Sequence, residues 1–258
     1  FQVSSSATMS RLADASYAFL KKFSFDGLDI DWEFPSWSSD SQKTDRQRFP
    51  LLLKALREKF GTSLFLTVSV SGPPTITKVA YKAESFNRYV DLVNVMNYDF
   101  HIFSYFNPFV GFNAPLRKLV IKRFTSFLCW FCSNFLLTLY PFVLKVFGIP
   151  TYGRGYRLIN WRVNKPYSLA SAYMVVLQTC KLAEQSSAYT YVWNNQAASP
   201  YLHGSDKLWL SFEDVKSIRA KTQYAQKLGI AGVMVYDIGS DDVYGLCGNG
   251  TYPLLRAI

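Results

Sequence analysis

The sequence contains an apolar run at residues 25–35, FDGLDIDWEFP, in which acidic residues recur at every second position. Side chains at positions i, i+2 and i+4 of a β-strand share one face. A strand here would carry Asp29, Asp31 and Glu33 on one face and apolar residues on the other. Buried carboxylates are costly unless they are paired or hydrogen-bonded. We therefore expect a fold in which this strand packs against helices on its apolar face and turns its acids to a common interior.

The three acids also predict chemistry. Carboxylates this close cannot all ionise freely, so repulsion and burial should raise the pKa of at least one of them. Glu33 lies at the C-terminal end of the run, which is the end where a barrel of parallel strands opens to substrate. A carboxylic acid held protonated there can donate a proton to a leaving group. A salt-bridge cluster or a site for Mg²⁺ or Ca²⁺ is the alternative.

Short apolar, β-rich runs alternate with helical patterns along the chain. Strands are predicted at residues 27–34, 64–70, 92–100, 146–152 and 230–238, and helices at 45–60, 83–90 and 211–229. Pro50 is expected near the first turn of its helix, and the last helix is expected to start at Ser211 as N-cap and stop at Gly229. This alternation is typical of βαβ units in a parallel sheet covered by helices.

Composition limits the classes of partner. The net charge is +10, but no Lys/Arg stripe interleaved with aromatic residues is present, so we do not expect nucleic-acid binding. Aromatic residues make up 17% of the chain, which suits a groove that stacks sugar rings. Cys129 and Cys132 have C-x-x-C spacing without a nearby His or second pair, so no zinc site is expected. We expect neither a metal nor a cofactor.

Residues 124–144 contain no charged residue and are flanked by Lys122, Arg123 and Lys145. Their length could span a membrane, but Pro141 and several polar residues argue against it. A buried helix is favoured, while an aberrant segment and a transmembrane helix remain open. The residues from Phe1 onward have neither a basic n-region nor an apolar h-region, so no signal peptide is expected in this sequence.

The motif DGLDIDWE at residues 26–33 resembles the DGxDxDxE signature of family 18 glycoside hydrolases, the chitinases and their lectin-like relatives. Other stretches that resemble the family are VMNYDFH (95–101), NAPL (113–116), GIPTYGRGYRL (148–158) and FEDVKSIRAKTQYAQKLGIAGVMVYDIGSDD (212–242). The resemblance covers most of the chain, with 117–145 and parts of 159–190 unmatched.

The resemblance implies a (β/α)8 TIM barrel. The family's barrel starts with three βα units and an S-x-G-G strand before the acid strand, whereas residues 1–22 here are only the helix that leads into it. We therefore expect a barrel lacking roughly its first three βα units, formed by residues 1–154 and 211–258. Residues 155–210, with aromatic strand-like pieces among polar turns, are expected to form an α+β insertion between the last two strands. Secretion is expected from the family.

The resemblance also implies hydrolysis of chitin or chito-oligosaccharides, polymers of β-1,4-linked N-acetylglucosamine, with retention. The acetamido oxygen of the substrate attacks the anomeric carbon in this family. Glu33 would protonate the glycosidic oxygen, and Asp31 would orient the acetamido group and stabilise the charged intermediate. Asp29 would partner Asp31, Asp26 would order the entrance of the strand, and Tyr98 would hydrogen-bond the acetamido carbonyl.

Five further residues are implied as sugar contacts: Met96, Asp99, Tyr152, Arg154 and Tyr236. The last of these is a departure, because the family usually has a Trp there, and a Tyr stacks with less area. Ile102 and Phe103 are a second departure, since the family often has Gly and a polar residue at these positions.

Cys180 and Cys247 could pair or be buried as free thiols on the sequence alone; they fall where the family has a disulfide, so the resemblance implies that they pair. Asn249 in NGT is a glycosylation acceptor if the protein is secreted.

Lectin-like members of the family typically lose the general-acid Glu, so the presence of Glu33 favours an enzyme. Its activity is expected to fall at alkaline pH as Glu33 loses its proton. The alternatives are a non-catalytic chitin- or oligosaccharide-binding protein and an inactive truncated fragment.

Overall fold

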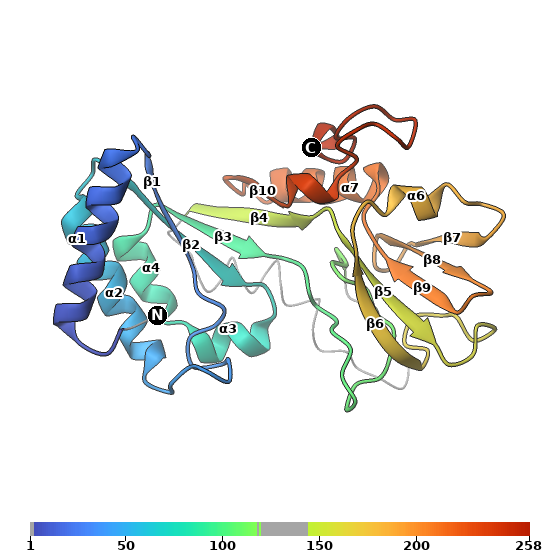
Figure 1. Ribbon diagram of the computed structural model, residues 1–258, viewed down its shortest axis with the longest axis horizontal. Coiled ribbons are helices and arrows are strands. Elements are labelled where there is room, and N and C mark those ends of the chain that lie inside the picture. Colours follow the sequence, from blue (N-terminus) through green and yellow to red (C-terminus); the bar gives the residue numbers. More distant parts are fainter. Residues whose placement is uncertain (1–2, 118, 120–143) are drawn as a thin grey trace. The chain divides into compact units, whose positions relative to one another are not determined.

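The computed structural model describes residues 3–117, 119 and 144–258 (Figure 1). They form two compact units. Unit 1 contains residues 3–96 and 144–147, and unit 2 contains residues 97–117, 119 and 148–258. Most of the uncharged segment, with Cys129 and Cys132, lies outside the described residues, so the predictions made for it stay predictions. No helix in the described ranges combines the length and the apolar character needed to cross a membrane.

Unit 1 contains the predicted parallel sheet, in the strand order β1-β2-β3-β4 (Figure 1). The strands are β1 (Gly27–Asp31), β2 (Phe65–Ser71), β3 (Leu92–Met96) and β4 (Leu144–Pro150), of which β4 continues into unit 2. Three predicted strands were too long, one of them the strand predicted at residues 230–238, which is found only as β10 (Gly232–Tyr236) of unit 2. Pairing of β1 with β2 ends at Asp31, so Glu33 lies beyond the strand, and β3 ends at Met96 rather than at residue 100.

Helices cover the apolar face of this sheet. They are α1 (Ser6–Lys22), α2 (Asp45–Phe60), α3 (Pro74–Ala80) and α4 (Ala83–Tyr89). Ile30 and Trp32 are buried in one apolar cluster with Leu52 and Leu53 of α2, and the Trp32 ring packs edge-on to Phe49. Each fully buried side chain of this size contributes roughly 1.5–3 kcal/mol. The prediction that the apolar face of the acid run packs under helices is confirmed.

The helix predicted at residues 45–60 is confirmed as α2, whereas α3 was not predicted. Pro50 is the sixth residue of α2 and so lies in its second turn, slightly later than expected.

Unit 2 contains the end of β4 beside β10 (Gly232–Tyr236), followed by η1 (Ile238–Ser240) and η2 (Leu255–Ala257). The N-cap of helix α7 (Val215–Lys227) is Asp214, whose carboxylate accepts the Ser217 N–H while the Ser217 hydroxyl accepts the Asp214 N–H. The prediction of Ser211 as N-cap is wrong, because Ser211 is paired in a strand. The predicted stop at Gly229 is confirmed by its φ of +64°, which glycine adopts without strain.

A second, antiparallel sheet in unit 2 has the strand order β6-β5-β9-β8-β7. Its elements are β5 (Gly153–Leu158), β6 (Ala170–Val176), the short helix α6 (Cys180–Ala183), β7 (Tyr189–Asn194), β8 (Ser199–Gly204) and β9 (Leu208–Ser211). The Trp209 ring is fully buried and stacks on Tyr201 at 4.9 Å. These strands fall in and around the predicted insertion at 155–210, whose boundaries stay a prediction.

Candidate active site

We use the name acid strand for residues 29–33, in which Asp29 and Asp31 lie in β1 and Glu33 follows two residues after its end. Strand alternation separates these acids from Ile30 and Trp32, as predicted. All three acids are nevertheless exposed, whereas a buried interior was expected. The reason is that β1 is an edge strand of the described sheet, where no further strand covers it.

Asp29 is held by three neutral donors from the two neighbouring strands. Its carboxylate accepts Thr67 Oγ1 at 2.5 Å and Ser69 Oγ at 2.8 Å from β2, and Asn94 Nδ2 at 2.9 Å from β3. The parallel register places all of these side chains on the same face as Asp29. The sequence analysis missed the three donors, although the alternation of polar and apolar residues in FLTVSV and LVNVM is a signal for them.

Asp31 shows the predicted shift. Partial burial raises the pKa of its carboxyl group, and the negative charge of Asp29 raises it further. The proton affinity of Asp31 therefore responds to its surroundings.

Glu33 lies in a bend after β1, followed by a short turn. The Ser38 hydroxyl accepts the Phe34 N–H at 3.0 Å and donates to the Phe34 carbonyl at 2.9 Å, which fixes the backbone next to Glu33. The backbone carbonyl of Asp26 accepts the Phe65 N–H at 2.8 Å, which ties the entrance of β1 to β2.

Met96 ends β3 and is buried in unit 1. It shares the strand face of Asn94, two residues earlier, and therefore the face of the acids.

The Asp99 cluster of unit 2 comprises Asp99, Tyr152 and Arg154. One carboxylate oxygen, Asp99 Oδ1, accepts Tyr152 Oη at 2.7 Å, Arg154 Nε at 2.9 Å and Arg154 Nη2 at 2.6 Å. Asp99 has a φ of +56°, a left-handed conformation that Asp tolerates better than most residues. Its N–H donates to Asn113 Oδ1 at 3.0 Å, a partner that the sequence analysis did not single out although it lies in the NAPL motif.

Burial and the charge of Asp99 together determine the protonation of Tyr152 and Arg154. Burial raises the pKa of the Tyr152 phenol, and the charge and hydrogen bond of Asp99 raise it further. Burial alone would lower the pKa of Arg154, but the hydrogen bonds and charge of Asp99 outweigh it and raise that pKa. Both partners therefore stay protonated at neutral pH and act as donors.

Three tyrosines pack together beside this cluster. The Tyr98 ring lies 6.0 Å from Tyr152 edge-on and 6.0 Å from Tyr236 in a stacked arrangement. The Tyr98 hydroxyl donates to Met234 Sδ at 3.8 Å, a contact that was not predicted. Tyr98 and Tyr152 are buried, while Tyr236 is 54% exposed and so can offer its ring to a ligand.

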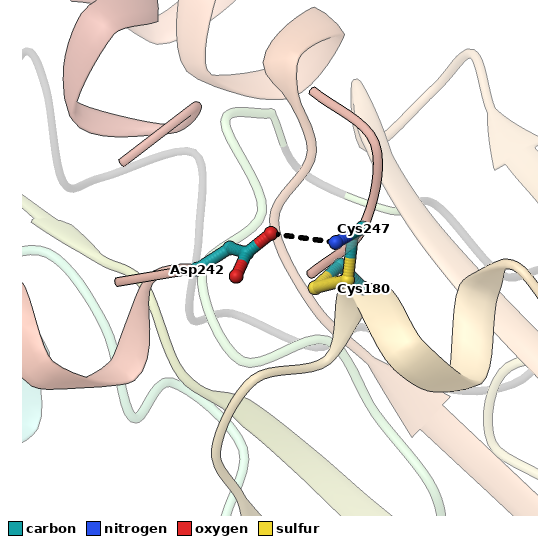
Figure 2. A group of neighbouring side chains, drawn as sticks. All are labelled: Cys180, Asp242 and Cys247. Carbon is teal, nitrogen blue, oxygen red and sulfur yellow. Dashed lines mark hydrogen bonds between the residues drawn. A yellow bond between two sulfur atoms is a disulfide. The ribbon is translucent and has the colours of Figure 1, made fainter. Parts of the chain in front are cut away.

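The pairing of Cys180 with Cys247 that the resemblance implied is confirmed by a disulfide (Figure 2). The Asp242 carboxylate accepts the Cys247 N–H at 2.8 Å. Cys180, Asp242 and Cys247 form a group of possible metal ligands, with their ligand atoms within 4.8 Å of one another. In the part of the chain that the structure describes, it is the one group of three or more His, Cys, Asp or Glu side chains placed in this way. Both sulfur atoms are used in the disulfide, so this group offers no thiolate to a metal.

The predicted site residues thus fall into two groups. In unit 1, Asp29, Asp31 and Met96 share one sheet face, and Glu33 follows directly. In unit 2, the Asp99 cluster and the tyrosines contact one another.

Comparisons with known proteins agree with the resemblance. The family model described as "Glycosyl hydrolases family 18" matches residues 1–241. The "Probable chitinase 2" of Drosophila melanogaster is 29% identical, over 93% of this chain and 56% of that protein. This chain spans a little over half the length of the first curated relatives that it matches.

Two solved structures are also similar. The Group IV chitinase of Ostrinia furnacalis has a TM-score of 0.90 at 31% identity, covering 99% of this chain and 73% of that one. Human YKL-39, described as a pseudo-chitinase with retained chitooligosaccharide binding properties, has a TM-score of 0.87 at 25% identity, covering 99% of this chain and 74% of that one.

Proposed function

Because the chain belongs to the glycosyl hydrolases of family 18, we propose that it hydrolyses chitin and chito-oligosaccharides, with Glu33 as the general acid. The observation that carries this proposal is the acid strand. Asp29 is fixed by three neutral donors beside Asp31, whose pKa is raised, and Glu33 follows at the C-terminal end of the same strand.

The reaction we propose is substrate-assisted. Glu33 gives its proton to the glycosidic oxygen, and the acetamido oxygen of the substrate attacks the anomeric carbon as the glycosidic bond breaks. Asp31 accepts the acetamido N–H and stabilises the positive charge of the cyclic intermediate. Asp29 helps to set the protonation of Asp31, because its negative charge adds to the effect of burial in raising the pKa of Asp31. Water then opens the intermediate, and Glu33 takes up the proton of that water.

We assign binding of the reacting sugar to five further residues. The Tyr98 hydroxyl donates to the acetamido carbonyl, and the exposed Tyr236 ring stacks on the sugar. Asp99 and Arg154 make polar contacts with the sugar, and the hydrogen bond between them fixes their positions. Tyr152, which donates a hydrogen bond to Asp99, holds this pair in place. Met96 contributes an apolar contact.

We also propose that residues 1–154 and 211–258 form the part of a (β/α)8 barrel that follows roughly its first three βα units, with residues 155–210 as an α+β insertion. The alternation of parallel strands and helices in unit 1 and the antiparallel sheet in unit 2 support this assignment. We further propose secretion, with Asn249 as a glycosylation site. Asn249 is exposed, and disulfides such as Cys180–Cys247 persist mainly in oxidising compartments.

The test is turnover of a fluorogenic chito-oligosaccharide by the chain and by Glu33→Gln. The amide keeps the shape of the side chain but cannot donate a proton as an acid, so we expect the rate to fall by about 10²–10⁴-fold. Asp40→Asn, at another exposed acid that follows the acid strand, is the matched control and should keep the rate. Equal rates for the wild type and Glu33→Gln would overturn the assignment.

A second candidate function is oligosaccharide binding without turnover. It is favoured by the likeness to YKL-39 and by the exposure of the acid strand, which water can reach. Calorimetric titration with chitotetraose separates the two, because binding with no detectable turnover would favour the second. An inactive fragment would show neither, and no cooperative melt by circular dichroism.

A further inference from the structure

A tight turn at residues 104–107 of unit 2 holds two aromatic side chains out in solvent. Two backbone hydrogen bonds close the turn, from Asn107 N–H to the Ser104 carbonyl at 3.0 Å and from Ser104 N–H to the Asn107 carbonyl at 3.3 Å. The Ser104 hydroxyl also accepts the Asn107 N–H at 3.0 Å. At the tip, Tyr105 is 92% exposed and Phe106 is fully exposed. We call residues 104–107 the aromatic turn.

Both arms of the aromatic turn are fixed to β6, an edge strand of the second sheet (Figure 1). Before the turn, the Phe103 ring stacks on Tyr173 of β6 at 5.9 Å. After the turn, the Pro108 carbonyl accepts the Ala170 N–H at 2.8 Å. The two rings at the tip are therefore presented on a fixed support, and binding through them costs little ordering of the backbone.

The degree of exposure separates two uses of aromatic side chains. A ring that stacks on a sugar offers one face and rests on protein with the other, as Tyr236 rests on Tyr98. Tyr105 and Phe106 instead stand almost clear of the protein, so stacking on one face would leave most of their apolar surface in water. Insertion into a lipid interface covers the whole ring, and aromatic side chains are favoured there.

The chain around the aromatic turn is basic. Residues 100–110 and 155–178 contain the turn, β6 and most of β5, and they hold no Asp or Glu. They contain three cations, all of them exposed: Arg157, Arg162 and Lys165. The turn between β8 and β9, which is hydrogen-bonded to the end of β5, adds Asp206 and Lys207, whose charges cancel. The net charge at this end of β6 is therefore positive.

The acids of unit 2 lie away from the aromatic turn or are ion-paired. Three lie toward β7, the opposite edge strand of the sheet: Glu184, Asp206 and Asp214. Three adjoin the C-terminal end of β6, where the Gln178 N–H donates to the Ser240 carbonyl at 3.2 Å: Asp237, Asp241 and Asp242. The other two pair with cations: Asp99 with Arg154 and Glu213 with Lys221. Charge is thus separated across unit 2, with the aromatic turn on the positive side.

We propose that the aromatic turn binds a lipid surface that carries negatively charged headgroups. Tyr105 and Phe106 enter the boundary between headgroups and acyl chains, and Ile102, which is half exposed, adds apolar area. The three exposed cations contact the headgroup phosphates. Ile102 and Phe103 stand where the family often has Gly and a polar residue, so the apolar character of this loop belongs to this chain. Binding is to the surface of the bilayer and does not cross it.

Co-sedimentation of the full chain with vesicles tests the proposal. Vesicles of phosphatidylglycerol and phosphatidylcholine in equal parts should bind at least about tenfold more tightly than vesicles of phosphatidylcholine alone, because each cation near an anionic surface adds about fivefold. Raising the salt concentration from about 0.1 M to about 0.5 M should weaken this binding by screening the charges. Equal affinity for the two kinds of vesicle, or binding to neither, would overturn the proposal.

Variants at the tip test the apolar part. Tyr105→Ser with Phe106→Ser should weaken binding to the anionic vesicles at least about tenfold, because two aromatic side chains no longer enter the lipid. The matched control is Tyr244→Ser with Leu246→Ser, which removes two exposed apolar side chains elsewhere in unit 2 and should leave binding unchanged. An equal loss in the control, or no loss in the tip variant, would overturn the assignment of the turn.

Variants of the cations test the charged part. Arg162→Gln with Lys165→Gln should weaken binding to the anionic vesicles about tenfold or more. The control is Arg219→Gln with Lys227→Gln, which removes two exposed cations from α7 and should have little effect. Heparin is a polyanion without an apolar phase. If the cation variant lost affinity for heparin and vesicles alike while the tip variant lost neither, the surface would bind polyanions and the lipid assignment would be overturned.

The depth of insertion can be measured directly with Phe106→Trp. Relative to the wild type, its added fluorescence should shift to shorter wavelength with anionic vesicles and be quenched by lipids brominated on the acyl chain. No shift would overturn insertion. The same shift without vesicles, rising with protein concentration, would show that a second copy of the chain covers the turn and would also overturn the proposal. None of these readouts depends on turnover of chito-oligosaccharides, so the proposed function can fail without this proposal failing.

Discussion

Asp29 in unit 1 and Asp99 in unit 2 are both carboxylates that accept three hydrogen bonds from side chains, but their donors differ. The donors to Asp29 are neutral hydroxyl and amide groups, and the neighbouring acid on its strand is Asp31. The donors to Asp99 are a phenol and a guanidinium. Asp99 is thereby neutralised within its own cluster, whereas the charge of Asp29 acts on Asp31 and raises its pKa.

The two sets of donors therefore suit the two carboxylates to different tasks. Proton chemistry, which we propose for the acid strand, needs a carboxyl group whose pKa the surroundings can shift, as they do for Asp31. Sugar binding, which we propose for the Asp99 cluster, needs groups whose geometry is fixed before the ligand arrives, and the charge-assisted hydrogen bonds of Asp99 fix the cluster in this way.

The largest effect that separates the two units should come from the disulfide. Reducing Cys180–Cys247, which lie 67 residues apart, frees a loop of that length and should cost unit 2 about 4 kcal/mol of unfolding free energy. Hydrogen exchange with and without a reductant should show lost protection in α6 and α7 but not in β1–β3. Equal loss in both units would mean that they unfold as one.

A smaller loss should follow Asp99→Ala. The variant leaves the guanidinium of Arg154, which is largely buried, without its anion, so we expect a loss of about 2–3 kcal/mol in urea unfolding. The control is Asp206→Ala, which removes an exposed acceptor of the Tyr189 hydroxyl and of the Leu208 N–H, both neutral donors, and should cost only about 1 kcal/mol. A similar cost for the two variants would contradict the anchoring role of Asp99.

Asp29→Asn should change proton affinity more than stability. Burial is the larger cause of the raised pKa of Asp31 and stays in the variant, but the added effect of the Asp29 charge is removed, so that pKa should fall part of the way toward its ordinary value of 3.8 in an NMR titration of the side-chain carboxyl carbon. A raised pKa in the folded state means that stability falls as pH rises above 3.8 through the folded value, and this fall should shrink in the variant. The unfolding free energy should change by only about 1 kcal/mol through the altered hydrogen bonds. An unchanged pKa for Asp31 would contradict the coupling.

The smallest effect should be on the pH dependence of stability and should come from His101 in unit 2. Here stability is lost as the pH falls, whereas for Asp31 it is lost as the pH rises. Burial lowers the pKa of His101, which its hydrogen bond with the Phe109 carbonyl only partly offsets. The unfolded chain therefore takes up a proton first, near the ordinary value of 6.5, and stability is lost as the pH falls below that value. Melting temperatures between pH 7.5 and 5 should decline less in His101→Gln than in the wild type. A decline as steep as that of the wild type would show that His101 is not the group responsible.

Some of this arrangement could be predicted from the sequence because it depends on local periodicity. Alternation alone placed Ile30 and Trp32 in the core and the acids on the other face, and the helical pattern gave α2. The end of β1 could not be predicted in this way, because the apolar pattern continues to Phe34 while pairing with β2 ends at Asp31.

The hydrogen-bond partners of the site residues were harder to predict from the sequence. Thr67 and Asn94 reach Asp29 only through the register of three strands that are far apart in the sequence. Ser211 and Asp214 are both good N-cap residues, and the choice between them depends on the pairing of Ser211 with Arg154 in the second sheet. The exposure of the acids depends on which other strands lie beside β1. The periodicity of a single strand does not predict this.

We propose that the acid strand carries the chemistry and that the Asp99 cluster holds the sugar. This division is tested by measuring kcat and KM on one fluorogenic chito-oligosaccharide for Asp31→Asn and Arg154→Met. We expect Asp31→Asn to lower kcat by about 100-fold or more with KM within a few-fold, and Arg154→Met to raise KM with kcat little changed. Equal losses of kcat in the two variants, or a wild type that binds the substrate without turning it over, would contradict it.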